Sequence, residues 1–281
     1  MILVLVFFAI GACFYMQLQM PSEKNHAGFW IAEPAFMPPE YWANLTEQIA
    51  SSMKDTSPAN IWVVGRIVFS PPGTCILSFP SNQTYPHMFF EAEDANEDCL
   101  AAFDDNEIKV CLEVEPGFAD VNQLINVVLE RYGHHPCILG VAVDLEWRWN
   151  SPQTRETVPV TDDEANQWLS GIKSHNPNYK LFLIHWLTNV MPHTAREDIV
   201  FIDDAQGFNS LDSLVKDSKL WGQNFSRTDV GYIFGYRKDL DWLSKLENPP
   251  KDIGLALIQS IPNCRFVFWS QETILDIFPP S

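Results

Sequence analysis

The chain has 281 residues and a formal net charge of −18, because 36 Asp and Glu residues stand against 18 Lys and Arg residues. So few basic residues, spread along the chain, do not form a phosphate-binding surface, which excludes nucleic acid as the main partner. The hydrophobic content of 46%, with 10 Trp and 19 Phe residues, is enough to bury a sizeable core and argues against a disordered chain.

The chain begins with an apolar segment. Residues 2–15 (ILVLVFFAIGACFY) form an almost uninterrupted apolar run. A membrane span takes about 20 residues, so this run fits the apolar region of a signal peptide better. Residues 10–13 (IGAC) also resemble a lipoprotein cleavage site. We therefore expect residues 1–24 to be a signal peptide or a membrane or lipoprotein anchor, and the protein to be secreted or membrane-anchored, outside the cytoplasm.

The remainder, residues 25–281, alternates between short apolar runs and amphipathic segments. Eight runs are apolar on both faces, which is typical of buried parallel strands. The segments between them have helical spacing, and one begins with a capping box formed by Thr161 and Glu164. The long loop after the second run contains a short predicted hairpin at 75–79. The predicted strands are 28–33, 60–69, 109–115, 138–147, 180–186, 198–204, 229–236 and 264–270, and the predicted helices are 39–53, 91–105, 119–132, 162–175, 210–221, 239–246 and 251–260.

Eight strands alternating with helices predict an α/β fold, a single (β/α)₈ TIM barrel, because this number favours a closed barrel over an open sheet. Functional sites of such barrels form at the C-terminal ends of the strands. Carboxylates and aromatic side chains are concentrated at those ends of this sequence. They are Trp30, Glu33, Glu113, Glu115, Asp144, Glu146, Trp147, Trp186, Asp203, Asp204, Tyr236 and Trp269, and the polar residues His185 and Gln206 lie among them.

The fourth predicted strand carries the clearest chemical signal. Asp144 and Glu146 are two residues apart, so on a strand both side chains point to one face. Gly140 and Ala142 share that face and leave room in the barrel centre. Two carboxyl groups this close repel each other, and burial also disfavours their charged forms, so at least one pKa is expected to rise. We therefore predict an acid that can donate a proton near neutral pH.

Residues 139–146 (LGVAVDLE) resemble the fourth-strand motif of family 18 glycoside hydrolases, the chitinase-like barrels, which reads D-x-x-D-x-D-x-E. Gly140, Asp144 and Glu146 match this motif, whereas its first two Asp residues are replaced by apolar residues, the second by Ala142. The resemblance implies that Glu146 is the proton donor and Asp144 its partner. In that family the acetamido group of the substrate attacks, assisted by an Asp of the motif.

Outside this motif the likeness to family 18 is limited. Trp269 resembles the eighth-strand Trp that forms the floor of the sugar site in that family. The third predicted strand, 109–115, lacks the Ser-x-Gly-Gly signature, and the sixth has Asp203 without the Tyr of the family's Tyr-Asp pair. The resemblance therefore covers the barrel order and one degenerate motif.

A glycosidase of the usual kind needs a second carboxylate, and Glu115 and Asp203 are the candidates for the base, the nucleophile or a stabilising group. The two carboxyl groups would lie about 5 Å apart in a retaining enzyme and about 6.5–9.5 Å apart in an inverting one. Aromatic faces stack on sugar rings, and polar groups bind sugar hydroxyls. The expected substrate-binding residues are Trp30, His185, Trp186, Gln206, Tyr236 and Trp269.

The sequence predicts no cofactor and no dedicated metal site. No C-x-x-C pair or Cys/His cluster with zinc spacing occurs, and no G-x-S-x-G, P-loop or dinucleotide-binding glycine motif is present. His134 and His135 precede the fourth strand, at the end of the barrel away from the expected site, so we interpret them as structural.

Three functions remain open from the sequence. The first is hydrolysis of a glycosidic bond in an extracellular or envelope polysaccharide, with Glu146 as the general acid. The second is a catalytically silent barrel that binds glycans. The third is a metal-dependent hydrolase of another bond, with a metal held by Glu115, Asp144, Glu146 and His185. A carbohydrate is the expected partner in the first two, and the sequence predicts no oligomeric state.

Overall fold

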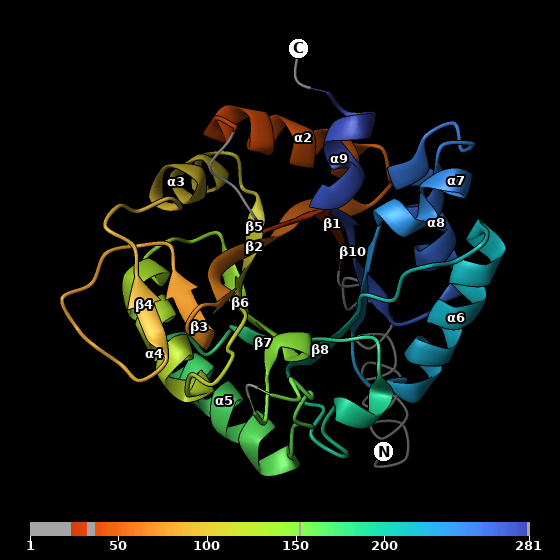
Figure 1. Cartoon of the computed structure of the whole chain (residues 1–281). Helices are drawn as coiled ribbons and strands as arrows, with labels where there is room; N and C mark the ends of the chain where they lie inside the picture. Colours follow the sequence, from red (N-terminus) through yellow and green to blue (C-terminus); the bar gives the residue numbers. More distant parts are fainter. Residues whose placement is uncertain (1–23, 33–36, 152, 280–281) are drawn as a thin grey trace, which may run out of the picture.

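Eight parallel strands form a closed barrel in the computed structural model, which describes residues 24–32, 37–151 and 153–279 (Figure 1). Within these residues each barrel strand pairs in parallel with the next, and β1 pairs with both β2 and β10, which closes the sheet. The prediction of a (β/α)₈ barrel is confirmed. The barrel strands are β1 (Asn25–Ile31), β2 (Thr56–Phe69), β5 (Lys109–Val114), β6 (Ile138–Asp144), β7 (Lys180–Ile184), β8 (Ile199–Asp203), β9 (Val230–Phe234) and β10 (Cys264–Ser270).

Helices surround the strands on the outside of the barrel (Figure 1). The predicted capping box is present, because the Glu164 N–H donates to the Thr161 hydroxyl and the Thr161 N–H donates to the Glu164 carboxylate. The sequence pattern does not predict the last helix, α9. The helices are α2 (Pro39–Ser51), α3 (Glu97–Asp105), α4 (Val121–Tyr132), α5 (Asp162–His175), α6 (Leu211–Asn224), α7 (Leu240–Leu243), α8 (Pro249–Ser260) and α9 (Gln271–Ile277), with 3₁₀ turns η2 (Leu145–Trp147), η3 (Thr188–Val190) and η4 (Arg237–Asp239).

A small extension of the sheet follows β2. The strand pairs antiparallel with β3 (Pro72–Leu77), which in turn pairs with β4 (Met88–Phe90). The hairpin predicted within residues 75–79 is therefore wrong, because residues 75–77 belong to a single strand that pairs with β2. Cys75 on β3 and Cys99 on α3 are free and buried, so the two residues do not form a disulfide.

Side chains at alternate positions of the strands enter the barrel interior. Ala142, Ile202 and Phe268 belong to a cluster inside the barrel. Phe201 and Trp269, which are next to two of them in the sequence, belong instead to the larger core between the strands and the helices. Because the alternation continues toward the strand ends, it decides which terminal side chains face the C-terminal mouth.

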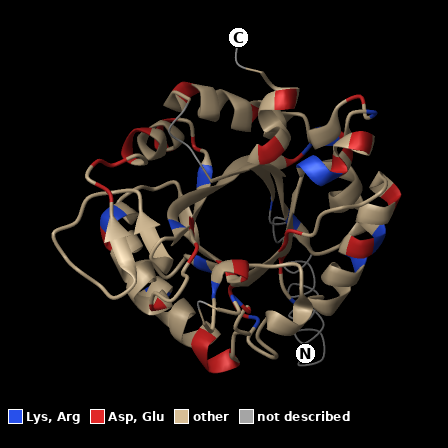
Figure 2. Ribbon diagram, in the orientation of Figure 1, with Lys and Arg blue, Asp and Glu red and all other residues tan. Residues whose placement is uncertain are grey.

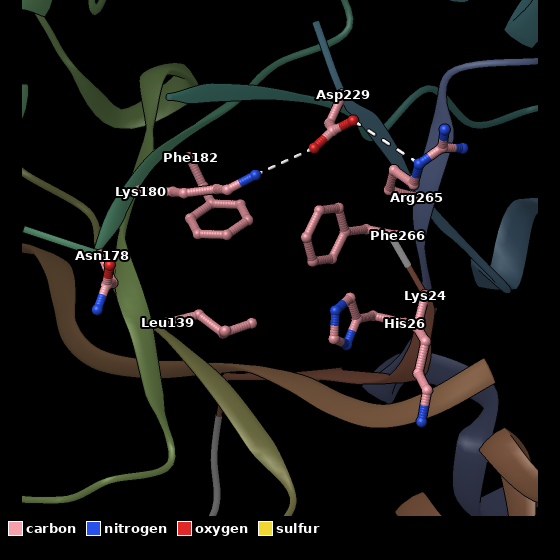
Figure 3. A pocket seen from close by; sticks show the side chains of 9 residues that line it. All are labelled: Lys24, His26, Leu139, Asn178, Lys180, Phe182, Asp229, Arg265 and Phe266. Atoms are coloured by element: carbon pink, nitrogen blue, oxygen red, sulfur yellow. Dashed lines mark hydrogen bonds and ion pairs between the residues drawn. The ribbon is translucent and has the colours of Figure 1, made fainter. Parts of the chain in front are cut away.

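The N-terminal end of the barrel holds a cavity of about 210 Å³ (Figure 3). Phe182 and Phe266 face each other across it with ring centroids 5.4 Å apart, and His26 stacks on Phe266 at 5.0 Å. Asp229 forms ion pairs with Lys180 at 3.1 Å and Arg265 at 3.8 Å. Apolar rings therefore line the barrel axis at this end, and Asp229 pairs with two of the cations around them.

Acidic side chains occur both on the outer helices and on the loops at the barrel mouth, as the large negative charge of the chain leads one to expect (Figure 2). Among the described helices, none is long and apolar enough to cross a membrane. The predicted leader, residues 1–24, lies outside the described residues except for Lys24. The leader therefore stays a prediction.

Strands β6 and β7 come very close together at Gly140. This residue has a φ of 153°, and a Cβ atom added to it would lie 1.9 Å from the carbonyl oxygen of Lys180 on β7. A side chain here would force the two strands apart, because a backbone oxygen cannot move without the strand. The motif glycine is therefore required by the barrel wall itself.

We predict that Gly140→Ala lowers the free energy of unfolding by about 2–4 kcal/mol, through backbone strain and loss of strand pairing. Gly171→Ala on α5 is the matched control, since a Cβ atom there meets nothing nearer than Ile125 at 4.0 Å. It should leave the stability equal or raise it by up to about 1 kcal/mol. Urea unfolding followed by circular dichroism measures both, and equal stabilities of the two variants would contradict this reading of β6.

Candidate active site

Five carboxylates gather at the C-terminal end of the barrel, and we call Glu113, Glu115, Asp144, Glu146 and Asp204 the acidic mouth. They come from the ends of β5, β6 and β8 and from the turns that follow. One carboxylate oxygen from each of Glu113, Glu115 and Asp144 lies within 4.8 Å of the other two. Burial, followed by neighbouring negative charges that include Glu146, raises the pKa of Asp144 and Asp204 well above the ordinary value.

Glu113 lies at the centre of the acidic mouth and is fully buried. Its Oε2 accepts a hydrogen bond from Trp30 Nε1 at 2.7 Å, whereas its Oε1 has no partner in the described part of the chain. Burial and then the charge of Glu115 raise the pKa of Glu113 well above its usual value. Burial therefore favours the protonated form of Glu113.

Glu115 follows directly after β5 and is held by the backbone of β2. Its Oε2 accepts a hydrogen bond from the Ile67 N–H at 2.6 Å. Burial raises the pKa of Glu115 to about 7, with the Ile67 N–H opposing this effect and the charge of Glu146 adding to it. Glu115 therefore exchanges its proton in the pH range where a general acid or base works best.

Strand β6 ends at Asp144, and the 3₁₀ turn η2 places Glu146 beyond the strand. The prediction that the two side chains share one strand face is therefore wrong. Asp144 instead caps the turn, because its Oδ1 accepts a hydrogen bond from the Glu146 N–H at 2.9 Å. Asp144 is buried and Glu146 is half-buried. Burial raises the pKa of Glu146, and the charge of Lys238 opposes that rise.

The two carboxylates at the end of β8 face opposite sides of the barrel wall. Asp203 is two residues after Phe201, which points outward toward the helices, so Asp203 points the same way. Burial and, to a smaller extent, the charge of Asp217 on α6 raise the pKa of Asp203 to about 7. Asp204 is two residues after Ile202, which points into the barrel, so Asp204 also points inward. The charge of Glu146 contributes to the raised pKa of Asp204. The structure therefore brings Asp204 into the acidic mouth, whereas Asp203 lies against α6.

Two of the expected sugar-binding residues lie directly beside the carboxylates. Trp30 is half-buried and donates to Glu113 as described above. Tyr236 is buried in the inner cluster at the end of β9. Burial and then the charges of Asp204, Asp144 and Glu113 raise the pKa of Tyr236 well above its usual value. Its hydroxyl therefore stays protonated.

The end of β7 adds a neutral imidazole and an exposed indole. The Nδ1 of His185 accepts a hydrogen bond from the Leu187 N–H at 2.9 Å, so the ring proton is on Nε2. Burial lowers the pKa of His185 to about 4. Trp186 stacks on this ring at 4.2 Å and is 40% exposed, and Gln206 is exposed on the loop after β8.

Trp269 does not line the mouth. It is fully buried in the core outside the strands, where its Nε1 donates to Thr273 Oγ1 at 2.9 Å and its ring meets Phe234 edge-on at 5.3 Å. The alternation of side chains along β10 explains this position. Phe268 points into the barrel, so its neighbour Trp269 points outward. The tryptophan that we expected as a sugar floor therefore supports α9 instead.

A group of aromatic side chains beyond the ends of β2 and β6 forms a candidate sugar platform. Phe69 is 51% exposed, and its ring lies 6.1 Å from Trp147 and 5.8 Å from Trp149. Trp147 and Trp149 are themselves 5.9 Å apart. Exposed and half-buried rings next to the acidic mouth are suited to stacking on sugar rings.

The arrangement of the acidic mouth supports two kinds of chemistry. Carboxyl groups with raised pKa values can donate and accept protons near neutral pH. The oxygens of Glu113, Glu115 and Asp144 could alternatively hold a divalent cation, which oxygen ligands favour.

The closed barrel and its carboxylate-lined mouth define a (β/α)₈ barrel with an acidic site at the strand C-termini. No protein-family model matches the sequence, and a search of curated proteins finds no match. Solved structures, in contrast, resemble the chain over most of its length, and several of them are glycosidases.

Three of these structures illustrate the likeness. The endocellulase from Pyrococcus horikoshii has 12% identity and a TM-score of 0.50, over 89% of this chain and 85% of that one. The beta-D-glucuronidase from Dictyoglomus thermophilum has 10% identity and a TM-score of 0.52, over 88% and 43%. The beta-glucuronidase from Parabacteroides merdae has 9% identity and a TM-score of 0.51, over 88% and 31%. The chain thus spans less than half of either glucuronidase, and at these identities the likeness shows the fold.

Three residues of this region are missing from the site expected from the sequence. Glu113 and Asp204 appear there only as strand-end residues without a role, and Phe69 does not appear as a candidate. The alternation of side chains could have identified the two carboxylates. Glu113 and Asp204 each lie two residues after a side chain inside the barrel, Cys111 and Ile202 respectively.

We predict that stability falls as the pH rises, because Glu115 ionises less readily in the folded state than in the unfolded chain. With a folded pKa of about 7 and an ordinary value of 4.5, the folded state binds more protons between these limits. This carboxyl therefore favours folding below about pH 4.5 and loses up to roughly 3 kcal/mol of that contribution by pH 7.

Glu115→Gln removes the titration and keeps an acceptor for the Ile67 N–H. Urea unfolding between pH 4.5 and 7.5 should show a smaller loss of stability in this variant than in the wild type. Glu107→Gln, a glutamate at the opposite end of β5, provides a control that should retain the wild-type slope. Parallel curves for Glu115→Gln and the wild type would argue against a protonated Glu115.

Proposed function

We propose that the protein is a glycosidase that cleaves a glycosidic bond in a polysaccharide. The observation that carries this proposal is the acidic mouth, in which carboxyl groups with raised pKa values lie close together at the end of the barrel where such sites form. Hydrolysis of a glycosidic bond needs one carboxyl group to protonate the leaving oxygen and another to act at the anomeric carbon. The glycosidase barrels to which the chain is similar support the same class of reaction.

Burial divides the roles within the acidic mouth. Glu146 is half-buried and can reach a substrate, and its raised pKa suits a general acid. Glu115 and Asp204 are the candidates for the base, the nucleophile or the stabilising carboxylate, since the charge of Glu146 acts on both. Glu113 and Asp144 are more deeply buried, which leaves them less accessible to a substrate than Glu146.

The resemblance to family 18 enters this proposal at one strand. Asp144 and Glu146 keep the last two acidic positions of its motif, while Ala142 is fully buried inside the barrel and has no carboxylate to offer. Glu113 lies on the neighbouring strand, and its charge is the next contribution after burial to the raised pKa of Asp144. We propose that Glu113 supplies the third carboxyl group that the motif has lost.

The substrate of this proposal is a polysaccharide that runs across the mouth. Phe69 and Trp147 in one group and Trp186 at the end of β7 offer partly exposed rings, and stacking on several rings favours a chain over a single sugar. The apolar segment at 2–15 supports the proposal of a secreted or membrane-anchored protein. Under that proposal the substrate is an extracellular or envelope polysaccharide.

The decisive test compares two acidic residues. Glu146→Gln should lower the rate of oligosaccharide hydrolysis by about 10²–10⁴-fold, because it removes the proton donor. Asp203→Asn is the matched control and should keep the wild-type rate, since Asp203 faces α6. The purified protein is incubated with chitin, peptidoglycan, β-glucan and galactosaminoglycan fragments, products are followed by mass spectrometry, and binding is measured by calorimetry in the same samples.

Two outcomes would change the assignment. Full activity of Glu146→Gln with an unchanged circular dichroism spectrum would remove Glu146 from the reaction. Heat of binding without shortened products from the wild type would favour a silent glycan-binding barrel.

A metal-dependent hydrolase is a second candidate, favoured by the three oxygens of Glu113, Glu115 and Asp144 within 4.8 Å of one another. In that case EDTA should abolish the activity of the purified protein, and Mg²⁺ or Mn²⁺ should restore it. A glycosidase that works by proton transfer keeps its activity in EDTA. Measuring both rates in one buffer decides between the two candidates.

A further inference from the structure

A second polar cluster lies away from the acidic mouth, at the N-terminal end of β6. Its members are Glu97 in the first turn of α3 and His134 and His135 in the connection between α4 and β6, and we call them the histidine–glutamate cluster. The Nε2 atom of His134 and the Nε2 atom of His135 each lie 3.4 Å from the same oxygen, Glu97 Oε1. The two imidazole rings are 4.1 Å apart.

Each imidazole in the cluster lies between two oxygen acceptors. His134 Nδ1 is 3.1 Å from the carbonyl oxygen of Arg131, and His135 Nδ1 is 2.6 Å from Asp104 Oδ2. A neutral imidazole has one N–H, so if each Nδ1 donates to its oxygen, each Nε2 turns a lone pair toward the Glu97 carboxylate. Charging both rings would instead place two cations side by side.

The arrangement is costly at His135. This residue is only 5% exposed, and its Nε2 has no hydrogen-bond partner among the residues described. A buried nitrogen without a partner costs free energy that solvent cannot recover. A metal cation between the two nitrogens and the carboxylate would satisfy all three groups at once.

We propose that Glu97, His134 and His135 bind a divalent transition-metal ion, with Zn²⁺ as the best match. Ligands about 2.0–2.1 Å from a tetrahedral Zn²⁺ lie about 3.3 Å from one another. Two of the three ligand separations are 3.4 Å, and all three ligand atoms lie within 4.8 Å of one another. Two imidazoles and one carboxylate select zinc over magnesium and calcium, which prefer oxygen alone, and water completes the set.

The surroundings of the cluster support the assignment. Asp104 binds the far nitrogen of His135, and a carboxylate in this position orients a metal-binding histidine and strengthens it as a ligand. The guanidinium of Arg131 pairs with Asp94 at 2.6 Å and lies 3.7 Å from Glu97 Oε2, so it faces the carboxylate oxygen that is not proposed as the ligand. The side chain of His134 is 59% exposed and that of Glu97 is 40% exposed, which gives an ion a path from solvent.

A metal here would act as a clamp between elements. Glu97 belongs to α3, which precedes β5, whereas His134 and His135 belong to the connection that leads into β6. Binding would therefore join the outer layer to the barrel across two successive α/β units. The site is independent of the proposed glycosidase activity, because residues at the N-terminal end of such a barrel contribute to stability.

The test uses the purified full chain, freed of metal with EDTA and dialysed. Titration calorimetry with ZnCl₂ should show one bound ion per chain, and thermal unfolding should shift to higher temperature with zinc. Co²⁺ in place of Zn²⁺ should give the visible absorption of a tetrahedral site. His134→Gln changes an exposed residue and should weaken zinc binding by at least about 10-fold, and Asp104→Asn by about 10–100-fold.

Matched variants separate this site from other zinc binding. His193→Gln alters an exposed histidine between β7 and β8 and should leave the affinity unchanged. Glu113→Gln tests the acidic mouth and should also leave it unchanged. The proposal is overturned if the wild type binds no zinc, or if zinc binding persists in a folded His134→Gln/His135→Gln double variant.

Discussion

The alternation of side chains along each strand of the closed barrel is the constraint on which the C-terminal mouth depends. A strand turns successive residues to opposite sides of the barrel wall, so a terminal residue faces either the mouth or a helix. Asp203 and Asp204 are neighbours in the sequence, yet one lies against α6 and the other enters the acidic mouth. Trp269 and Phe268 divide in the same way. The chemistry of the site therefore follows from where each strand ends.

Placing carboxylates on several inward positions has an energetic cost, because burial disfavours charge and like charges repel. The pKa values of its most buried members, Glu113 and Asp144, are raised, so the uncharged forms are favoured and the cost is reduced. Trp30 and the Ile67 N–H also provide hydrogen bonds to Glu113 and Glu115. A site of this kind is less stable than an apolar plug would be, and that loss is typical of functional sites. The aromatic rings that line the axis at the N-terminal end carry no such cost.

The fold could be predicted from the sequence because eight runs that are apolar on both faces leave few arrangements other than a barrel. The helix α5 was also defined by its capping box, whereas α9 is short and has no comparable signal. The site was harder to predict. Glu146 lies within a 3₁₀ turn that no strand pattern reveals. Asp203 and Asp204 differ only in which side of the barrel wall their positions face. His134 and His135 are adjacent in the sequence, and they meet Glu97 only because α3 packs near the end of α4.

The tautomer of His185 has a consequence for how the kinetics of this site would be interpreted. Its Nδ1 accepts from the Leu187 N–H and its pKa is about 4, so the ring remains neutral and its Nε2–H remains a donor throughout the neutral range. When kcat/KM rises or falls with an apparent pKa near 7, the titrating group is commonly assigned to a histidine. In this barrel the pKa values of about 7 belong to two carboxyl groups, Glu115 in the acidic mouth and Asp203 against α6. A kinetic profile that resembles that of a histidine enzyme would therefore report on a carboxyl group, with Glu115 as the candidate inside the mouth.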